Sequence, residues 1–334
     1  MKRVLITGGA GFIGFHTAAR LLRDGCEVGI VDNFNDYYAV SLKEDRFREL
    51  EKIAKEKKAD SLKLWRRDLA DDGTAREVME EWNPDTVIHL AAQPGVRYSI
   101  ENPAAYISSN IIGFFHILEA VRHHPVQHLV FASSSSVYGG NTKVPFEETD
   151  RVDEPESLYA ATKKADELMG YTYARLYGIP MTGLRFFTVY GPWGRPDMAA
   201  FLFTERILAD KPIRVFHHGD LRRDFTYIDD IVEGVVRVAD RAPSENEKGV
   251  RYRIYNIGNH TPVPLMEMIR TLETVIGKEA QKEFLPMQPG DVYQTYADVS
   301  ALTRDFGFHP DTPLAEGLRA FVDWYRSYYT HDGD

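Results

Sequence analysis

The sequence predicts an α/β protein built on a doubly wound parallel (Rossmann) sheet, followed by a smaller mixed α/β unit toward the C-terminus. Short apolar runs alternate with helical patterns through the first ~185 residues, which is the order expected for a parallel sheet with right-handed crossovers. The first apolar run ends in the glycine-rich turn TGGAGFIG at 7–14. In sheets of this kind a glycine turn between the first strand and the first helix is typical of dinucleotide binding.

Six apolar runs have the length of strands. Each is short and bounded by glycine, proline or a polar residue, as expected for strands buried on both faces of a sheet. The first ends in the glycines of the turn, and the second is closed by Asp32. The predicted strands are 4–7, 27–31, 62–65, 86–90, 128–132 and 181–186.

Five segments between and after these runs carry apolar residues at helical spacing. The first ends at Asp24-Gly25, the third stops before Pro84, and the last is broken by Gly178 and Pro180. The second is rich in Lys and Glu, which predicts a solvated face. The predicted helices are 12–23, 41–57, 74–82, 104–122 and 157–177.

The regular alternation breaks from Gly191 onward, where prolines and glycines cluster. A further helix is expected near 227–234, with Asp229 as its N-terminal cap. We therefore predict two units that enclose a crevice at the carboxyl ends of the strands. Residues 1–187, together with 226–260, form the dinucleotide-binding unit, and residues 188–225 and 261–334 form the substrate-binding unit.

Bulk composition is typical of a globular protein with a full core and argues against several other classes of protein. The chain has 334 residues, of which 43% are hydrophobic, enough for a full core. A formal net charge of −10 argues against nucleic acid as the main partner. The single cysteine, Cys26, cannot form an internal disulfide, which suits a reducing cytoplasm. Because no run of 18 apolar residues occurs, we expect no membrane span.

The spacing of Gly8, Gly11 and Gly14 predicts the phosphate end of the dinucleotide site. The turn needs a residue that tolerates positive φ, and the pyrophosphate needs close backbone approach. Asp32 follows about 20 residues after the turn, where an acidic residue binds the ribose hydroxyls. Because Asp32 would repel a 2′-phosphate and no Arg or Lys follows it before Lys43, the sequence favours NAD over NADP.

Asp68 and Leu69 follow the third predicted strand and have two interpretations. They can meet the adenine, or Asp68 can cap a helix. The remaining contacts expected for the coenzyme come from the same ends of the strands and from the long helix after the fourth strand. They are Phe12, Ile13, Asn33, Leu90, Ala91, Ala92 and Asn110.

Tyr159 and Lys163 are the candidate catalytic pair. Residues four apart share one face of a helix, so Lys163 can stabilise a phenolate at Tyr159. Such a phenolate, beside an oxidised nicotinamide, can take the proton of an alcohol. The Tyr-x-x-x-Lys pattern alone is weak, yet only Tyr159 among 18 tyrosines shows it. Its helix also follows the fifth strand, where the serine-rich segment 133–139 is expected to be a fixed loop at the same crevice.

These motifs resemble the extended short-chain dehydrogenase/reductase superfamily, within it the nucleotide-sugar epimerases, and most closely the UDP-glucuronate 4-epimerases. The resemblance covers nearly the whole chain. Beyond TGGAGFIG, it rests on HLAAQPGVRYS at 89–99, SSSSVYG at 133–139, YAATKKADE at 159–167, RFFTVYGPWGRPDMA at 185–199, RRDFTYIDD at 222–230 and QPGDV at 288–292.

The resemblance implies that Tyr159, Lys163 and Ser134 are catalytic. Tyr159 would remove the proton of the sugar 4-hydroxyl, with Ser134 sharing the hydrogen bond. The C4 hydride would pass to tightly bound NAD, and would return to the other face after the flat 4-keto sugar has turned over. Related 4,6-dehydratases carry Asp-Glu, and decarboxylases a Glu, in the serine loop. Ser135 and Ser136 stand there instead, so the keto sugar should be returned by reduction.

The substrate implied is UDP-glucuronate, converted reversibly to UDP-galacturonate. Arg195, with Ser135, Ser136 and Thr188 as further donors, is expected to hold the carboxylate so that the β-keto acid does not lose CO2. Many epimerases of neutral hexoses have Asn at the position of Thr188. The alternatives are a UDP-glucose or UDP-N-acetylglucosamine 4-epimerase, then a UDP-glucuronate decarboxylase, and last a non-catalytic NAD-binding regulator.

For the nucleotide, the resemblance assigns Phe216 to uracil, Arg223 with Arg214 or Arg97 to the diphosphate, and Gln288 and Asp291 to the ribose. Many relatives have Arg at the position of Gln288. The 11 histidines include no pair with metal-ligand spacing beside carboxylates, so no catalytic metal is expected.

The family usually forms homodimers through two long helices of each subunit, here 104–122 and 157–177. Their candidate contacts can also simply face the sheet. They are Phe114, Phe115, Leu118, Leu168 and Met169.

Overall fold

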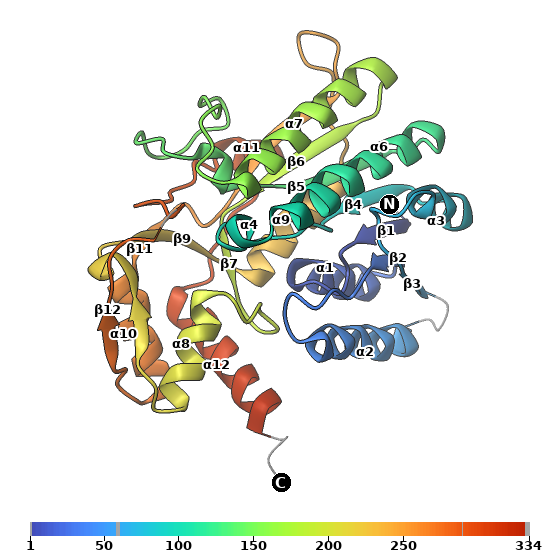
Figure 1. The fold of residues 1–334 in the computed structure, drawn as a ribbon. Coiled ribbons are helices and arrows are strands. Elements are labelled where there is room, and N and C mark those ends of the chain that lie inside the picture. The colour runs from blue at the N-terminus through green and yellow to red at the C-terminus, as the bar shows by residue number, and fades with distance from the viewer. Residues whose placement is uncertain (1, 58–60, 289, 331–334) are drawn as a thin grey trace.

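The computed structural model describes residues 2–57, 61–288 and 290–330. Its centre is a parallel 7-stranded sheet in the order β10-β6-β5-β4-β1-β2-β3 (Figure 1). The α/β fold class predicted from the alternating pattern is therefore confirmed. The strands are β1 (Arg3–Thr7), β2 (Glu27–Asp32), β3 (Leu62–Arg66), β4 (Thr86–His89), β5 (His128–Ser134), β6 (Met181–Phe186) and β10 (Tyr252–Ile257).

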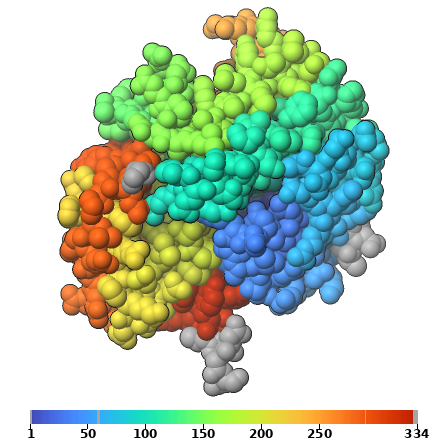
Figure 2. All heavy atoms as spheres, viewed as in Figure 1, coloured from blue at the N-terminus to red at the C-terminus, as the bar shows by residue number. Residues whose placement is uncertain are grey.

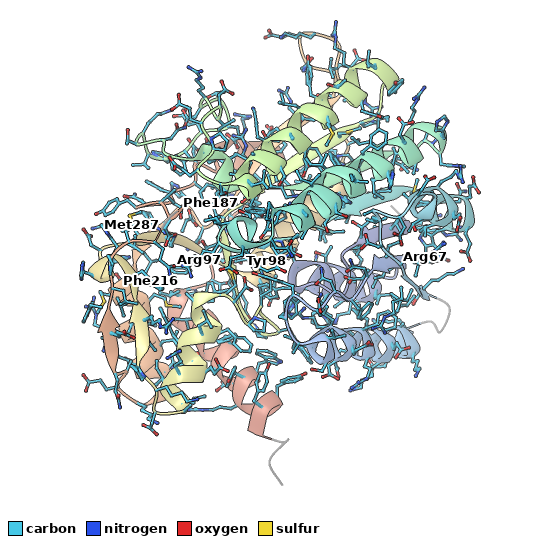
Figure 3. All side chains as sticks on the ribbon, viewed as in Figure 1. Arg67, Arg97, Tyr98, Phe187, Phe216 and Met287 are labelled. Atoms are coloured by element: carbon cyan, nitrogen blue, oxygen red, sulfur yellow. The ribbon has the colours of Figure 1, made fainter. Side chains whose placement is uncertain are left out.

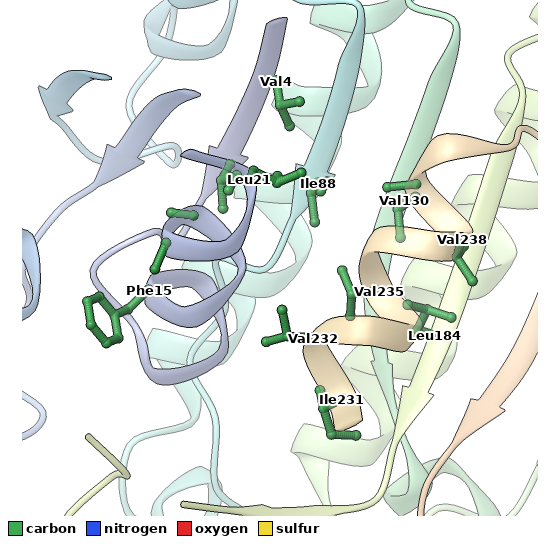
Figure 4. Close-up of a cluster of buried hydrophobic side chains, with 14 of the residues drawn as sticks. Val4, Phe15, Leu21, Ile88, Val130, Leu184, Ile231, Val232, Val235 and Val238 are labelled. Atoms are coloured by element: carbon green, nitrogen blue, oxygen red, sulfur yellow. The ribbon is translucent and has the colours of Figure 1, made fainter. Parts of the chain in front are cut away.

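Helices cover both faces of this sheet because alternate side chains of each strand point to opposite sides. On β1, Val4 and Ile6 belong to one core cluster, and Leu5 belongs to the other. Figure 4 shows the first cluster, in which α1 and α9 pack on the sheet. The helices of this face are α1 (Phe12–Arg23), α2 (Val40–Lys57), α9 (Ile228–Asp240) and α11 (Ser300–Phe306), and those of the other face are α3 (Thr74–Trp82), α6 (Gly113–His123) and α7 (Leu158–Tyr177).

A smaller part packs around its own core beside the main sheet. It contains a 3-stranded sheet, β11-β9-β7, and a 2-stranded sheet, β12-β8. In the space-filling view the two parts meet along a junction, with the teal segment around α4 (Tyr98–Glu101) lying beside it (Figure 2). The elements are β7 (Thr188–Tyr190), β8 (Ile213–Val215), β9 (Arg222–Tyr227), β11 (Pro262–Pro264), β12 (Lys282–Phe284), α8 (Ala199–Leu208), α10 (Leu265–Ile276) and α12 (Leu314–Thr330).

The chain crosses between these parts more than once. After β7 and α8 have contributed to the smaller part, α9 returns to the main sheet and β10 pairs with β6. The division of the chain into two units, with 226–260 in the first, stays a prediction.

The expected helix at 104–122 is found as one continuous helical stretch, Pro103–His123, made of α5 (Pro103–Tyr106), a π-helical segment (Ile107–Ile112) and α6, and the short α4 (Tyr98–Glu101) precedes it. Two other local predictions were wrong. Asp229 does not cap α9, since Tyr227 occupies that position and Asp229 lies in the first turn, where a carboxylate favours the helix dipole. The face of α2 is not wholly solvated, because Lys43 and Arg46 are buried.

The stretch Pro103–His123 is long and apolar enough, by composition, to cross a membrane, but 44% of it is buried inside the protein. A core helix of a globular protein passes the same test. Two of the candidate dimer contacts, Phe114 and Leu118, are fully buried on the side of α6 that packs on the core and cannot reach a second subunit. Met169 packs partly buried against the same core, whereas Phe115 and Leu168 are exposed.

Candidate active site

The glycine turn brings three pieces of backbone into contacts that a side chain would prevent. Gly8 has φ +70°, and a Cβ atom there would lie 2.7 Å from the backbone nitrogen of Ala91. A Cβ atom on Gly14 would lie 2.1 Å from the carbonyl oxygen of Gly8. Gly11 begins α1 without any side-chain cap, so the first N–H groups of the helix stay available. Such an uncapped helix end is suited to bind a phosphate.

A cavity opens at the carboxyl ends of the central strands, beside this turn. It brings together the predicted catalytic residues Ser134, Tyr159 and Lys163, and Arg195 from the segment after β7. Of the predicted coenzyme residues it is lined by Gly8, Gly11, Phe12, Ile13, Gly14, Asp32, Asn33, Asp68, Leu69, Leu90, Ala91 and Ala92.

Backbone amides hold Asp32 at the mouth of the turn. Its Oδ2 accepts a hydrogen bond from Ala10 N at 3.0 Å, and its Oδ1 accepts one from Phe34 N at 2.8 Å. Burial raises the pKa of Asp32, against the effect of these amides and of nearby Lys43. The carboxylate is therefore fixed in direction and faces the cavity, as expected for a group that meets ribose hydroxyls.

Asp68 does not cap a helix, because α3 begins only at Thr74, after Gly73. Instead, Asp68 Oδ1 accepts from Ala70 N at 2.8 Å, and Oδ2 accepts from Asn33 Nδ2 at 2.8 Å. The two candidate coenzyme residues Asn33 and Asp68 thus contact each other across β2 and β3.

Asn110 is not among the residues that line the cavity. It lies fully buried in the π-helical segment. Its Oδ1 accepts from Gln93 N at 2.7 Å, and its Nδ2 donates to Thr162 Oγ1 at 3.0 Å. Asn110 therefore ties the segment after β4 to α7, and any contact with the coenzyme stays a prediction.

Lys163 is deeply buried, with an exposed fraction of 2%. Its Nζ donates to the carbonyl of Ala132 at 3.0 Å and pairs with Asp166 Oδ2 at 3.1 Å. Burial raises the pKa of Asp166 to about 6, against the opposing effect of Lys163. The start of α7 is fixed by Ser157, whose Oγ accepts from Ala160 N at 3.1 Å. This cap places Tyr159 in the first turn, with its ring against that of Tyr106.

The serine run forms an ordered turn. Ser134 ends β5 and caps the 3-10 helix Ser135–Tyr138, because its Oγ accepts from Ser136 N at 3.2 Å. Ser133 Oγ donates to Glu167 of α7 at 2.7 Å, which fixes the loop against that helix. Ser134 lines the cavity, whereas Ser135, Ser136 and Thr188 are not among its lining residues.

The predicted nucleotide-binding residues lie in a second group at the junction of the two parts. Arg223 pairs with Asp291 at 3.1 Å, and Arg97 approaches the same carboxylate at 3.7 Å. The guanidinium of Arg97 also lies over the ring of Phe216, at 5.1 Å from its centroid. Figure 3 labels Arg97 and Phe216 at this junction, with Arg67 near β3, at the far end of the main sheet.

Two other predicted residues fit this group less directly. The side-chain Oε1 of Gln288 is buried and has no hydrogen-bond partner among the described residues. Arg214 pairs with Glu283 of β12 at 3.9 Å, within the 2-stranded sheet of the smaller part. In 2–57, 61–288 and 290–330, no three His, Cys, Asp or Glu side chains gather as a possible metal site.

Sequence reasoning missed several residues that line the cavity, chiefly Tyr37, Tyr38 and Lys43. Lys43 Nζ donates to the side-chain and backbone oxygens of Asn35, both at 2.6 Å, and burial lowers its pKa to about 8. The signal available in the sequence was the polar, tyrosine-rich stretch directly after Asp32. A loop that follows a ligand-binding strand end is well placed to line the site.

Known proteins are similar to this chain in sequence and in fold. Residues 4–258 match the NAD dependent epimerase/dehydratase family. UDP-glucuronate 4-epimerase 4 of Arabidopsis thaliana is 47% identical over 98% of this chain and 76% of its own. The structure of UDP-glucuronic acid 4-epimerase from Bacillus cereus with UDP-glucuronic acid and NAD superposes with a TM-score of 0.88 at 34% identity, covering 98% of this chain and 100% of that one.

A structure with a different sugar superposes almost as well. UDP-glucose 4-epimerase from Thermotoga maritima with UDP-glucose gives a TM-score of 0.85 at 28% identity, over 98% of this chain and 99% of the other. The fold alone therefore does not select the sugar. The sequence match and the site geometry agree on the wider assignment: the chain belongs to the NAD dependent epimerase/dehydratase family.

Proposed function

We propose that this protein interconverts UDP-glucuronate and UDP-galacturonate by epimerisation at C4, using tightly bound NAD. The observation that carries the proposal is one shared cavity. Tyr159, Lys163 and Ser134 line it together with a guanidinium, that of Arg195. Asp197 occupies one edge of that guanidinium, and a uronate carboxylate, unlike a neutral hexose, offers an anion for its remaining donors.

The residues at the glycine turn fit a dinucleotide. Because Gly8, Gly11 and Gly14 carry no side chains, the turn leaves room for a pyrophosphate at the start of α1. The carboxylate of Asp32 is oriented for a ribose. Asp32 also disfavours a 2′-phosphate. Bound here, NAD would supply the acceptor and the donor of the C4 hydride.

Tyr159 would act as the base at the sugar 4-hydroxyl and would return the proton after the ring has turned over. Ser134, held at the end of β5, would share the hydrogen bond to that oxygen. The buried ammonium of Lys163 would stabilise the phenolate, because a nearby positive charge in a low-dielectric site favours the anion. No acid or base stands at Ser135 or Ser136 to move a proton from C5, so we do not expect dehydration.

Arg195 would hold the uronate carboxylate while C4 is a ketone. A β-keto acid loses CO2 when its carboxylate lies perpendicular to the carbonyl plane, so a fixed orientation protects it. We propose Ser135, Ser136 and Thr188 as further donors to the same carboxylate. Phe216, Arg223, Gln288 and Asp291 are proposed to bind the uridine diphosphate.

A nuclear magnetic resonance assay of the purified protein against a panel of UDP-sugars tests this proposal. We expect UDP-glucuronate to give UDP-galacturonate, and UDP-glucose and UDP-N-acetylglucosamine to react far more slowly. Faster turnover of a neutral sugar would replace the proposal with its nearest rival. Stoichiometric CO2 from UDP-glucuronate would indicate a decarboxylase, and no turnover of any sugar would indicate a regulator.

We also propose that the protein works as a cytoplasmic homodimer, without nucleic acid or membrane as a partner. Support for the dimer comes from exposed apolar side chains on neighbouring helical segments. They are Ile107, Ile112, Phe115, Leu168 and Leu176, with exposed fractions from 40% to 65%. We call this set the α6–α7 face. Its apolar character fits an isologous interface between two copies.

A further inference from the structure

Arg195 is held by an ion pair inside the cavity. Its Nε donates to Asp197 Oδ1 at 2.9 Å, and its Nη2 donates to Oδ2 at 2.5 Å. The exposed fractions of the two side chains are 20% and 31%. Among the described residues, Nη1 of Arg195 has no hydrogen-bond acceptor. One edge of the guanidinium is thus occupied by Asp197, and the opposite edge keeps donors for another anion.

Tyr37 completes this arrangement from the loop between β2 and α2. Its hydroxyl donates to Asp197 Oδ2 at 3.1 Å. Its ring packs on that of Tyr98 at 4.8 Å, and a Cβ atom on Gly95 would lie 2.9 Å from its hydroxyl oxygen. Burial and Asp197 raise the pKa of Tyr37, so the hydroxyl remains a donor at all working pH values. The carboxylate of Asp197 is therefore fixed on both sides.

We propose that Asp197, assisted by Tyr37, is a positioning residue that holds Arg195 oriented for the uronate carboxylate. This inference rests on the proposed uronate substrate. Arginine has many rotamers, so an unpaired Arg195 would have to be ordered when the substrate binds. The ion pair orders it beforehand. An orientation set in advance also keeps the carboxylate away from the geometry that permits loss of CO2.

Loss of CO2 from the 4-keto uronate is the side reaction to be measured. In the 4-keto uronate, the bond between C5 and the carboxyl carbon breaks, and its electron pair enters the 4-keto group as an enolate. CO2 leaves, and C5 takes up a proton to give a 4-keto pentose. No oxidant beyond the coenzyme that made the ketone is needed. A less firmly held carboxylate should therefore appear as CO2.

A binding experiment separates positioning from general damage to the fold. NAD-loaded protein carrying Tyr159→Phe, whose turnover is expected to be about 10³-fold slower, is titrated calorimetrically with UDP-glucuronate and with UDP-glucose. On that background we expect Asp197→Ala to weaken UDP-glucuronate about tenfold, the loss of roughly one charge-assisted contact, and to change UDP-glucose less than about twofold. Asp197→Glu should recover part of the loss, and Tyr37→Phe should weaken the uronate less, in the same direction.

Asp36→Asn is the matched control, because it removes an exposed carboxylate from the loop that carries Tyr37. It should leave both affinities unchanged. With Tyr159 restored, Asp197→Ala should also release more CO2 per epimerisation than the wild type, measured with carboxyl-labelled UDP-glucuronate.

Two results would overturn the inference. One is equal weakening of both sugars, which would indicate a structural role. The other is tighter binding of UDP-glucuronate by Asp197→Ala without extra CO2, which would mean that Asp197 only reduces the effective positive charge of Arg195. Failure of the proposed function is seen separately, since the wild type would then not convert UDP-glucuronate at all.

Discussion

At the Tyr159–Lys163 pair, a buried ammonium lies between a backbone carbonyl and the carboxylate of Asp166. Burying a charge is costly unless it is paired, so this ion pair must offset that cost in the absence of ligand. The same pairing fixes Nζ, and Lys163 lines the cavity together with Tyr159. Lys163 therefore offers the site an ammonium group in a fixed position.

Tyr159→Phe removes the proposed base and keeps the ring that packs on Tyr106. We expect turnover of UDP-glucuronate to fall by about 10³-fold, within the range typical of general acid–base catalysis. The matched control is Tyr171→Phe, the same substitution further along α7. Steady-state rates of both variants measure the effect, and a Tyr159→Phe enzyme as fast as the control would remove Tyr159 from the mechanism.

His128 predicts how stability depends on pH. Its ring nitrogens contact Thr182 Oγ1 at 2.9 Å and the carbonyl of Ala239 at 3.4 Å, and burial lowers its pKa from 6.5 to about 4. Because the native state disfavours the charged form, its contribution is present above pH 6.5 and is lost as pH falls toward 4. Linkage gives a loss of about 3 kcal/mol across that window.

Thermal unfolding of the wild type and His128→Gln at pH 7.5 and pH 5 measures this contribution. The glutamine side chain keeps polar atoms at the site but has no proton to gain. We expect the variant to lose less of its Tm between the two pH values than the wild type does. An equal loss would show that His128 is not one of the groups that destabilise the protein in acid.

At the scale of elements, the turn between β1 and α1 depends on contacts that exist only for glycine. A Cβ atom on Gly14 would meet the carbonyl oxygen of Gly8 at 2.1 Å, so Gly14→Ala must move the turn. We expect that variant to lose most of its bound NAD, measured by releasing the coenzyme from purified protein. Gly113→Ala, where the nearest atom is 3.5 Å away, is the control and should retain it.

The π-helical segment before α6 shows what spacing alone does not reveal. Apolar residues at helical intervals predicted one helix over 104–122, and the helical hydrogen bonding is indeed nearly continuous there. The wider turn at 107–112 places Asn110 where it bonds Gln93 and Thr162. These tertiary contacts, rather than local propensity, select the π-helical geometry.

At the scale of the whole molecule, the α6–α7 face predicts the oligomeric state. Leu168 belongs to this face and is 58% exposed, and a charge there would be buried without a partner in an isologous dimer. We expect Leu168→Glu to convert the dimer to monomers in sedimentation equilibrium. Leu202→Glu places the same charge on an exposed leucine of α8 and should leave the dimer intact. A wild type that sediments as a monomer would refute the interface.

The sequence by itself determined the parallel sheet and most of the predicted residues that line the cavity. Strand ends, the glycine turn and the Tyr159–Lys163 spacing are local patterns, since each depends on residues only a few positions apart. The six predicted strands lie within two residues of β1 to β6 for this reason.

Only the tertiary structure decided how the site is closed. Tyr37 and Asp197 are 160 residues apart, and Arg223 and Asp291 are 68 apart, so no local pattern links them. Burial of Phe114 and Leu118, and exposure of Leu168, likewise follow from how α6 and α7 pack on the sheet. Periodicity marks an apolar face, but only packing shows whether the sheet or a second subunit covers it.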